Sequence, residues 1–176
     1  MTLLLAGHGT TSTVLSWTLY FLAKNPDIQD QLRKEILNVF IDPNHFPSFE
    51  EIDQLKFLEC VFKEALRITP PSPSYMRCNL KDEIMNGYVI PKMLNLLTHL
   101  DGIKSKISNS NFIPFSDGPR GCLGMRMAHL LYKTFLSIII RNLKFGLVDD
   151  FTFKKRTFGI CQPVPGMDLL VSKVEH

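Results

Sequence analysis

The sequence predicts a mainly α fold with a small β part, as one compact domain or part of a larger one. Two long apolar stretches, at residues 1–24 and 125–143, have the length and composition of buried helices. The Asn86-Gly87 pair lies between two short strand-like runs and is typical of a two-residue hairpin turn. With 176 residues, 45% of them hydrophobic, the chain is long enough to bury a core of its own.

Charge and cysteine content exclude several classes of function. The formal charge is only +3 and the basic residues are scattered, so no nucleic-acid partner is indicated. None of the cysteines forms a C-x-x-C pair or lies at zinc-finger distance from a histidine, which argues against a disulfide scaffold or a zinc site and fits a reducing compartment. These cysteines are Cys60, Cys78, Cys122 and Cys161.

The first predicted helix, at residues 1–24, carries no charged residue before Lys24. Its centre, "AGHGTTSTVLSWT", contains two glycines, a histidine and six hydroxyl side chains, which argues against a signal peptide or a membrane span. We therefore expect a buried helix. A membrane anchor, if the intact protein has one, is expected upstream of this chain.

Helix boundary signals continue along the chain. Asn25-Pro26 ends the first helix and starts a second one, with Pro26 at its first position. Ser48 and Glu51 form the S-x-x-E capping box of a helical region at residues 48–67, with a break expected near Asp53.

The remainder divides into short segments with different patterns. Polar side chains of the apolar helix at 125–143 form one narrow stripe: Arg126, His129, Lys133, Ser137 and Arg141. The other segments expected are a small sheet at 75–92, a shortened connector without periodicity at 93–111, a cysteine loop at 112–124 and terminal strands at 144–176.

The cysteine loop, "FIPFSDGPRGCLG", carries the chemistry. Gly118 and Gly124 lack Cβ atoms, so the backbone there can adopt positive φ and a flat group can approach it. Cys122 precedes a helix, whose N-terminal N–H groups favour a thiolate, and a thiolate is a strong soft ligand for iron. Arg120 is a fixed cation that can bind a carboxylate. The alternative is a structural cysteine beside an ordinary glycine turn.

The spacing F-x-x-G-x-R-x-C-x-G is filled by Phe115, Gly118, Arg120, Cys122 and Gly124. It resembles the heme-binding loop of the cytochrome P450 superfamily. The resemblance implies that Cys122 is the axial ligand of the iron, that Arg120 pairs with a heme propionate and that Phe115 packs beside the sulfur. Thiolate ligation donates electron density to iron and favours cleavage of the O–O bond.

Two further segments resemble the same family. "FKEALRITPP" contains the E-x-x-R pair Glu64 and Arg67, which is otherwise an ordinary exposed pair worth about 0.2–0.5 kcal/mol. "AGHGTTS" resembles the oxygen-groove segment, in which Thr10 relays protons; Gly9 takes the place of the usual acid. Close helix packing is the alternative reading of these small residues. Arg77 is either a second propionate-binding residue or a solvated strand residue.

The resemblance identifies the chain as the C-terminal portion of the cytochrome P450 fold, incomplete. It implies a heme-thiolate monooxygenase that binds heme b (iron protoporphyrin IX) and inserts one oxygen atom from O2 into an apolar small-molecule substrate. The implied redox partner is an NADPH-dependent cytochrome P450 reductase or a similar protein. The alternatives are a heme-thiolate isomerase or dehydratase acting on peroxides, which would suit Gly9, and a non-catalytic helical remnant.

The resemblance also implies what is missing. Relatives often lie at the endoplasmic reticulum membrane facing the cytosol, through an anchor that this chain lacks. In residues 93–111 we find no counterpart of the arginine that completes a triad with Glu64 and Arg67. The distal side of the heme would stay partly uncovered, so we expect an unstable or aggregation-prone chain that binds heme poorly.

Overall fold

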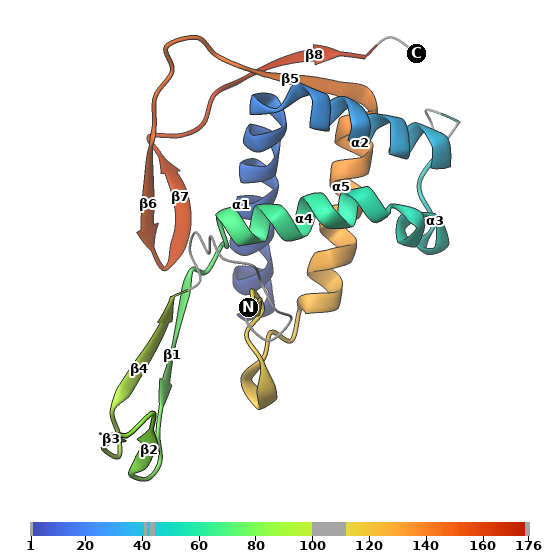
Figure 1. Ribbon diagram of the computed structural model, residues 1–176. Coiled ribbons are helices and arrows are strands. Elements are labelled where there is room, and N and C mark those ends of the chain that lie inside the picture. The colour runs from blue at the N-terminus through green and yellow to red at the C-terminus, as the bar shows by residue number, and fades with distance from the viewer. Residues whose placement is uncertain (1, 41, 43–44, 100–111, 175–176) are drawn as a thin grey trace.

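The computed structural model describes residues 2–40, 42, 45–99 and 112–174 (Figure 1). Its helices are α1 (Thr2–Lys24), α2 (Pro26–Val39), α3 (Phe49–Gln54), α4 (Lys56–Ile68) and α5 (Met125–Asn142). Figure 1 shows α1 and α5 running in the same direction, with α4 crossing them. No helix in the described part of the chain is long and apolar enough to cross a membrane.

The helix boundaries follow the signals in the sequence. Pro26 is the first residue of α2, and the capping box between Ser48 and Glu51 starts α3. The Asn25 side chain does not cap α2, because its amide donates a hydrogen bond back to the Phe21 carbonyl. The break expected near Asp53 lies at Leu55, between α3 and α4.

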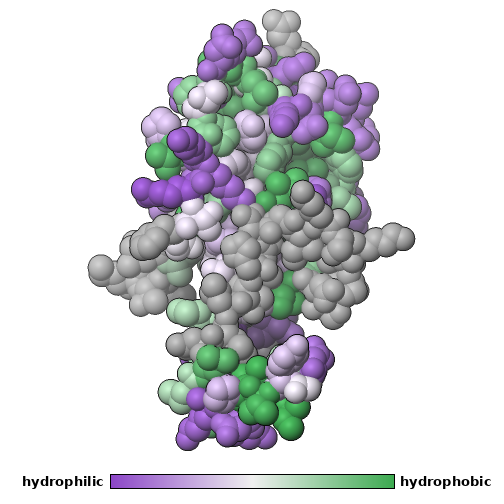
Figure 2. Space-filling view, turned by 60° about the vertical axis from the view of Figure 1, so that its left-hand side comes forward, coloured by the Kyte–Doolittle hydropathy of each residue, from purple (hydrophilic) through white to green (hydrophobic). Residues whose placement is uncertain are grey.

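The strands form four antiparallel pairs among the described residues. The pair β2–β3 turns at Asn86-Gly87, whose φ angles of 51° and 84° match the expected hairpin turn. Figure 2 shows apolar surface on this hairpin, at the lower end of the molecule, where Ile84, Tyr88 and Val89 are exposed. The pairs are β1 (Ser74–Cys78) with β4 (Asn95–His99), β2 (Glu83–Met85) with β3 (Tyr88–Ile90), β5 (Leu143–Leu147) with β8 (Leu169–Lys173), and β6 (Lys154–Phe158) with β7 (Ile160–Val164).

Strand β4 corrects one expectation. Residues 93–111 were expected to form a shortened connector without periodicity, yet Asn95–His99 pairs with Ser74–Cys78 along its full length. This strand exists because a partner distant in sequence supplies its hydrogen bonds, which local periodicity cannot reveal. Residues 100–111 lie outside the described part of the chain.

Much of the polar stripe of α5 is buried. Lys133, Ser137 and Arg141 are buried, although α5 exposes Met127 and Phe135 on another face. The Lys133 ammonium lies 2.9 Å from a carboxylate oxygen of Glu59 on α4. The Arg141 guanidinium donates to the carbonyls of residues 42 and 45. The stripe is buried because α4 and the segment before α3 supply partners for its charges.

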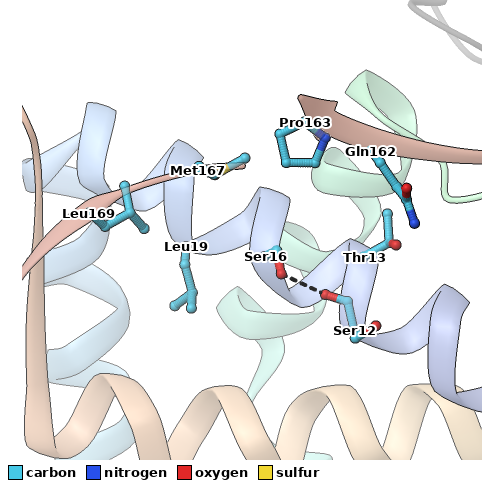
Figure 3. A pocket seen from close by; sticks show the side chains of 8 residues that line it. All are labelled: Ser12, Thr13, Ser16, Leu19, Gln162, Pro163, Met167 and Leu169. Atoms are coloured by element: carbon cyan, nitrogen blue, oxygen red, sulfur yellow. Dashed lines mark hydrogen bonds between the residues drawn. The ribbon is translucent and has the colours of Figure 1, made fainter. Parts of the chain in front are cut away.

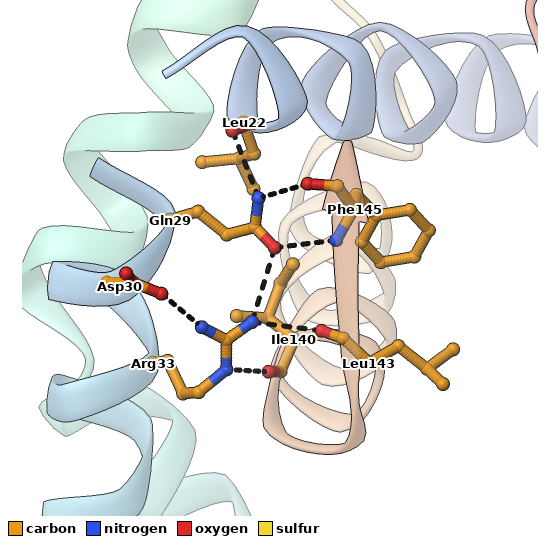
Figure 4. Close-up of polar contacts among 7 residues, drawn as sticks. All are labelled: Leu22, Gln29, Asp30, Arg33, Ile140, Leu143 and Phe145. Carbon is orange, nitrogen blue, oxygen red and sulfur yellow. Dashed lines mark hydrogen bonds and ion pairs between the residues drawn. The ribbon is translucent and has the colours of Figure 1, made fainter. Parts of the chain in front are cut away.

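A buried polar cluster fixes α2 against α5 and β5 (Figure 4). The Gln29 amide donates to the carbonyls of Leu22 and Phe145 and accepts from the Phe145 N–H. Arg33 donates to the carbonyls of Ile140 and Leu143 at the end of α5. These side chains satisfy backbone groups that would otherwise be buried without partners.

Replacing Gln29 with Leu is expected to lower the free energy of unfolding by about 2–4 kcal/mol, because each buried backbone group left without a partner costs about 1–3 kcal/mol. Chemical denaturation measures the change. Gln31 is exposed on the same helix, so Gln31→Leu should stay within about 0.5 kcal/mol of the parent chain. Equal effects of the two substitutions would contradict the role of the cluster.

The Glu59 carboxylate is expected to make stability depend on acidic pH. Burial raises its pKa, but the hydrogen bond and the charge of Lys133 hold the pKa below its ordinary value of 4.5. The stabilisation is therefore complete above pH 4.5 and is lost as the pH falls through the lower folded-state value. In pH-dependent denaturation, Glu59→Gln should be less stable than the parent chain at neutral pH, and the gap should close in acid. Glu50→Gln, at an exposed position on α3, serves as the control. A difference in stability for Glu59→Gln that persists in acid would show that the ionised Glu59 carboxylate is not its cause.

Candidate functional site

The loop before α5 presents Cys122 to solvent. Its backbone N–H donates a hydrogen bond of 2.9 Å to the carbonyl of Phe115. A short 3-10 turn over Gly118–Arg120 lies between the two residues and is closed by the Gly121 N–H on the Gly118 carbonyl. The sulfur is thus carried by a closed loop whose ends are tied together at Phe115.

The two glycines of the motif have different roles. Gly118 has a φ of 72°, which a residue with a side chain rarely adopts, as expected from the sequence. Gly124 has a φ of −86°, so it does not use the positive φ that a glycine permits. A Cβ atom on Gly124 would lie 4.0 Å from the Cys122 sulfur. Its lack of a side chain therefore keeps the space beside the sulfur open.

The two predicted propionate-binding arginines differ in their surroundings. Arg120 is exposed, and its guanidinium has no hydrogen bond or ion pair to any described residue. Arg77 extends from β1 to the cysteine loop, where it donates a 2.6 Å hydrogen bond to the Ser116 hydroxyl. Its guanidinium also lies 4.9 Å from the ring centre of Tyr75. Arg77 thus joins the small sheet to the loop.

The Phe115 ring faces the helices. Its centre lies 6.3 Å from that of Phe62 on α4 and 5.3 Å from that of His129 on α5. His129 also meets Phe62 edge to face at 4.8 Å. No functional role was predicted for His129. The available signal was its place in the polar stripe, seven residues after Cys122, but that spacing does not reveal ring contacts with α4.

Glu64 and Arg67 form a bidentate pair on α4, with N···O distances of 2.7 and 2.6 Å. The hydrogen bonds from Arg67 lower the pKa of Glu64 and keep it ionised. The predicted pair is therefore formed. No counterpart of the third partner was found in residues 93–111, of which residues 100–111 lie outside the described part of the chain.

Thr10 and Gly9 lie on α1. The Thr10 hydroxyl donates to the Ala6 carbonyl at 2.8 Å. A Cβ atom on Gly9 would lie 3.0 Å from the Cδ1 atom of Ile160, at the start of β7. The next residue, Cys161, is fixed because its carbonyl accepts the Trp17 indole N–H and its N–H donates to the Pro71 carbonyl. The β6–β7 hairpin therefore places an apolar side chain where the acid expected at position 9 would project.

A pocket of about 370 Å³ lies further along α1, between this helix and the segment from β7 to β8 (Figure 3). The hydroxyls of Ser12 and Ser16 donate to the carbonyls of Gly9 and Ser12, so their oxygens remain available as acceptors in the lining of the pocket. Its lining combines hydroxyl groups with apolar side chains and includes Ser12, Thr13, Ser16, Gln162, Pro163 and Met167. It is separate from the cysteine loop.

The residues present fit a heme held through one thiolate. Cys122 supplies a soft sulfur donor on an exposed loop, and Gly124 leaves the space next to it open. Arg120 offers a guanidinium that can bind a carboxylate bidentately.

Comparisons with known proteins show the family of the chain. The sequence model of the family described as cytochrome P450 matches residues 1–106 and 100–171, and the two matches overlap within the predicted connector. Secologanin synthase 1 of Catharanthus roseus is 30% identical, over 97% of this chain and 37% of that protein. Cytochrome P450 4F12 of Homo sapiens is 31% identical, over 94% of this chain and 36% of that protein. Probable cytochrome P450 4ac3 of Drosophila melanogaster is 32% identical, over 87% and 35%.

The chain spans about a third of the length of these curated relatives. The mainly α architecture with small antiparallel sheets corresponds to an incomplete form of the family fold. The extent of the family match, together with the identity to relatives that cover nearly the whole chain, establishes that this protein belongs to the cytochrome P450 family.

Proposed function

We propose that the chain is the heme-binding C-terminal part of a monooxygenase that inserts one oxygen atom from O2 into an apolar organic substrate. The observation that carries the proposal is the exposed Cys122 thiol on a loop closed at Phe115, next to the open space at Gly124. Heme b, when bound, supplies dioxygen activation, for which thiolate ligation favours O–O cleavage. Electrons would come from a reductase partner such as an NADPH-dependent cytochrome P450 reductase.

The residues around the sulfur would orient the thiolate and bind the heme propionates. The hydrogen bond from the Cys122 N–H to Phe115 fixes the backbone that carries the sulfur. Arg120 would hold a propionate carboxylate, since a guanidinium is always charged and binds carboxylates bidentately. Arg77 supports the loop through Ser116 and would add a second positive charge for a propionate. Glu64 and Arg67 keep their charges paired on α4.

Thr10 is proposed as the proton-relay residue on the distal side. A hydroxyl has one hydrogen to donate, and the Ala6 carbonyl accepts it in this structure. The Thr10 oxygen can therefore accept a hydrogen bond from water while its own hydrogen is held. Passing a proton onward requires the hydroxyl to rotate away from Ala6.

A second function, heme-thiolate isomerisation or dehydration of peroxides, is favoured by one observation. Position 9 carries no acid, and Ile160 borders the same space with an apolar side chain. Chemistry that starts from a peroxide does not need protons delivered to O2. The two functions are separated by measuring turnover with O2 and with peroxide. The Gly9→Glu, Ile160→Ala double variant is compared with the Ile160→Ala variant.

Reconstitution with excess hemin tests thiolate ligation. After reduction, the carbon monoxide difference spectrum is expected to show the red-shifted Soret band of a thiolate-bound heme, and Cys122→Ala should abolish it. Cys60→Ala, which removes another exposed cysteine, should leave the band intact. A colourless parent chain, or a band that survives Cys122→Ala, would refute the proposal and favour a non-catalytic remnant.

The contact between position 9 and Ile160 is tested by measuring how alanine substitutions at Gly7 and Gly9 change the stability of the chain. Gly7 and Gly9 both lie in α1, but a Cβ on Gly7 meets no atom within 4 Å. Gly7→Ala is therefore expected to stabilise the chain by about 0.5–1 kcal/mol, whereas Gly9→Ala should gain less. Ile160→Val removes the Cδ1 atom, so in that background the two substitutions should become equivalent. Thermal or chemical denaturation measures the four variants; equivalence with Ile160 intact would show that the contact imposes no restriction.

A further inference from the structure

The cysteine loop contacts the hydrophobic core through Phe112 and Phe115 near its start, whereas its centre is exposed. Residues 117–123 are exposed, and the hydrogen bond from the Cys122 N–H to the Phe115 carbonyl closes the loop. Phe115 is half-buried and packs against the hydrophobic core. The position of Cys122 therefore depends on how firmly the Phe115 side chain is held.

Two rings hold Phe115. Phe62, on α4, is almost fully buried and lies in the core, 6.3 Å from Phe115 between ring centres. His129 lies nearer, at 5.3 Å, and its ring makes the edge-to-face contact with Phe62. His129, in the second turn of α5, thus closes the cluster around Phe115.

The surroundings of His129 favour a role for its ring. Its Nδ1 atom lies 3.8 Å from Glu59, whose carboxylate is already paired with Lys133 at 2.9 Å. Burial lowers the pKa of His129, so its imidazole is neutral at pH 7 and packs as an aromatic ring. Aromatic pairs of this kind contribute beyond the area that they bury.

We propose that His129 is a positioning residue for Cys122 and acts through the ring of Phe115. This inference rests on the proposed function and deepens it, because it names a residue outside the heme-loop motif that sets the geometry of the thiolate ligand. The sequence motif ends at Gly124, whereas the support extends to the second turn of α5.

The test compares His129→Phe, which keeps a ring, with His129→Gln, which keeps a polar side chain but loses the ring. Amide hydrogen exchange is measured at Cys122 and at Ile140, a buried residue near the end of α5. His129→Gln is expected to speed exchange at Cys122 by about tenfold, as for the loss of one aromatic contact, with little change at Ile140. His129→Phe should restore the parent rate. Phe135→Ala, which truncates an exposed ring on another face of α5, is the matched control and should leave Cys122 unchanged.

A second measurement follows the thiol. In a background with Cys60→Ser and Cys78→Ser, Cys161 is buried, so alkylation by iodoacetamide reports mainly on Cys122. His129→Gln should change this alkylation rate, and His129→Phe should restore it. With hemin bound, His129→Gln should lose part of the thiolate Soret band, and His129→Phe should recover it.

Three results would overturn the inference. The first is an unchanged Cys122 exchange rate in His129→Gln. The second is equal acceleration at Cys122 and Ile140, and the third is a failure of His129→Gln to fold that His129→Phe does not repair. Either of the last two would mean that His129 has a general structural role. If the parent chain binds no heme, the proposed function fails, but the exchange and alkylation results still decide whether His129 positions the loop.

Discussion

The arrangement of α1, α4 and α5 depends on one buried side chain, Tyr132. Its hydroxyl lies 2.9 Å from that of Thr18 on α1, and its ring centre lies 4.1 Å from that of Phe62 on α4. Because the Thr18 hydroxyl donates to the Val14 carbonyl, Tyr132 is the donor, and burial raises its pKa and keeps it protonated. One side chain of α5 thus joins the helix that carries Thr10 to the helix that carries Glu64.

Side chains of α2 complete this framework by satisfying backbone groups of other elements. The Glu35 carboxylate accepts the N–H groups of Phe57 and Leu58 at the start of α4, where negative charge is favourable. Gln29 and Arg33 do the same for β5 and the end of α5. Both elements that support the cysteine loop, α4 and α5, are therefore fixed at one end by the same helix.

The sequence was informative where local rules decide the structure. The helix start at Pro26, the capping box at Ser48 and the turn at Asn86-Gly87 depend on neighbouring residues, and each was predicted. Strand β4 and the burial of Lys133 were not, because each depends on a partner distant in sequence. The same limit applies to the stripe of α5, whose spacing shows that its residues share a face but not which element covers it.

The features of the candidate site likewise divide into those that local sequence predicts and those that depend on distant contacts. The motif around Cys122 was predicted from spacing, and Gly118 has the conformation that the motif suggested. Gly124 does not have a positive φ, because its lack of a side chain serves to leave space beside the Cys122 sulfur. Residue type alone does not show which of these two requirements a glycine meets. His129 was missed, since its contacts arise from the crossing of α4 and α5.

The two sides of the proposed heme site are supported unequally. On the side of Cys122, the loop is tied to a closed cluster of Phe62, His129 and Tyr132. On the side of Thr10, the support is the hairpin that carries Ile160, next to an open pocket along α1. Positioning a thiolate requires only the first side, whereas excluding water during turnover requires both. The proposed thiolate ligation therefore demands less of this chain than the proposed catalysis does.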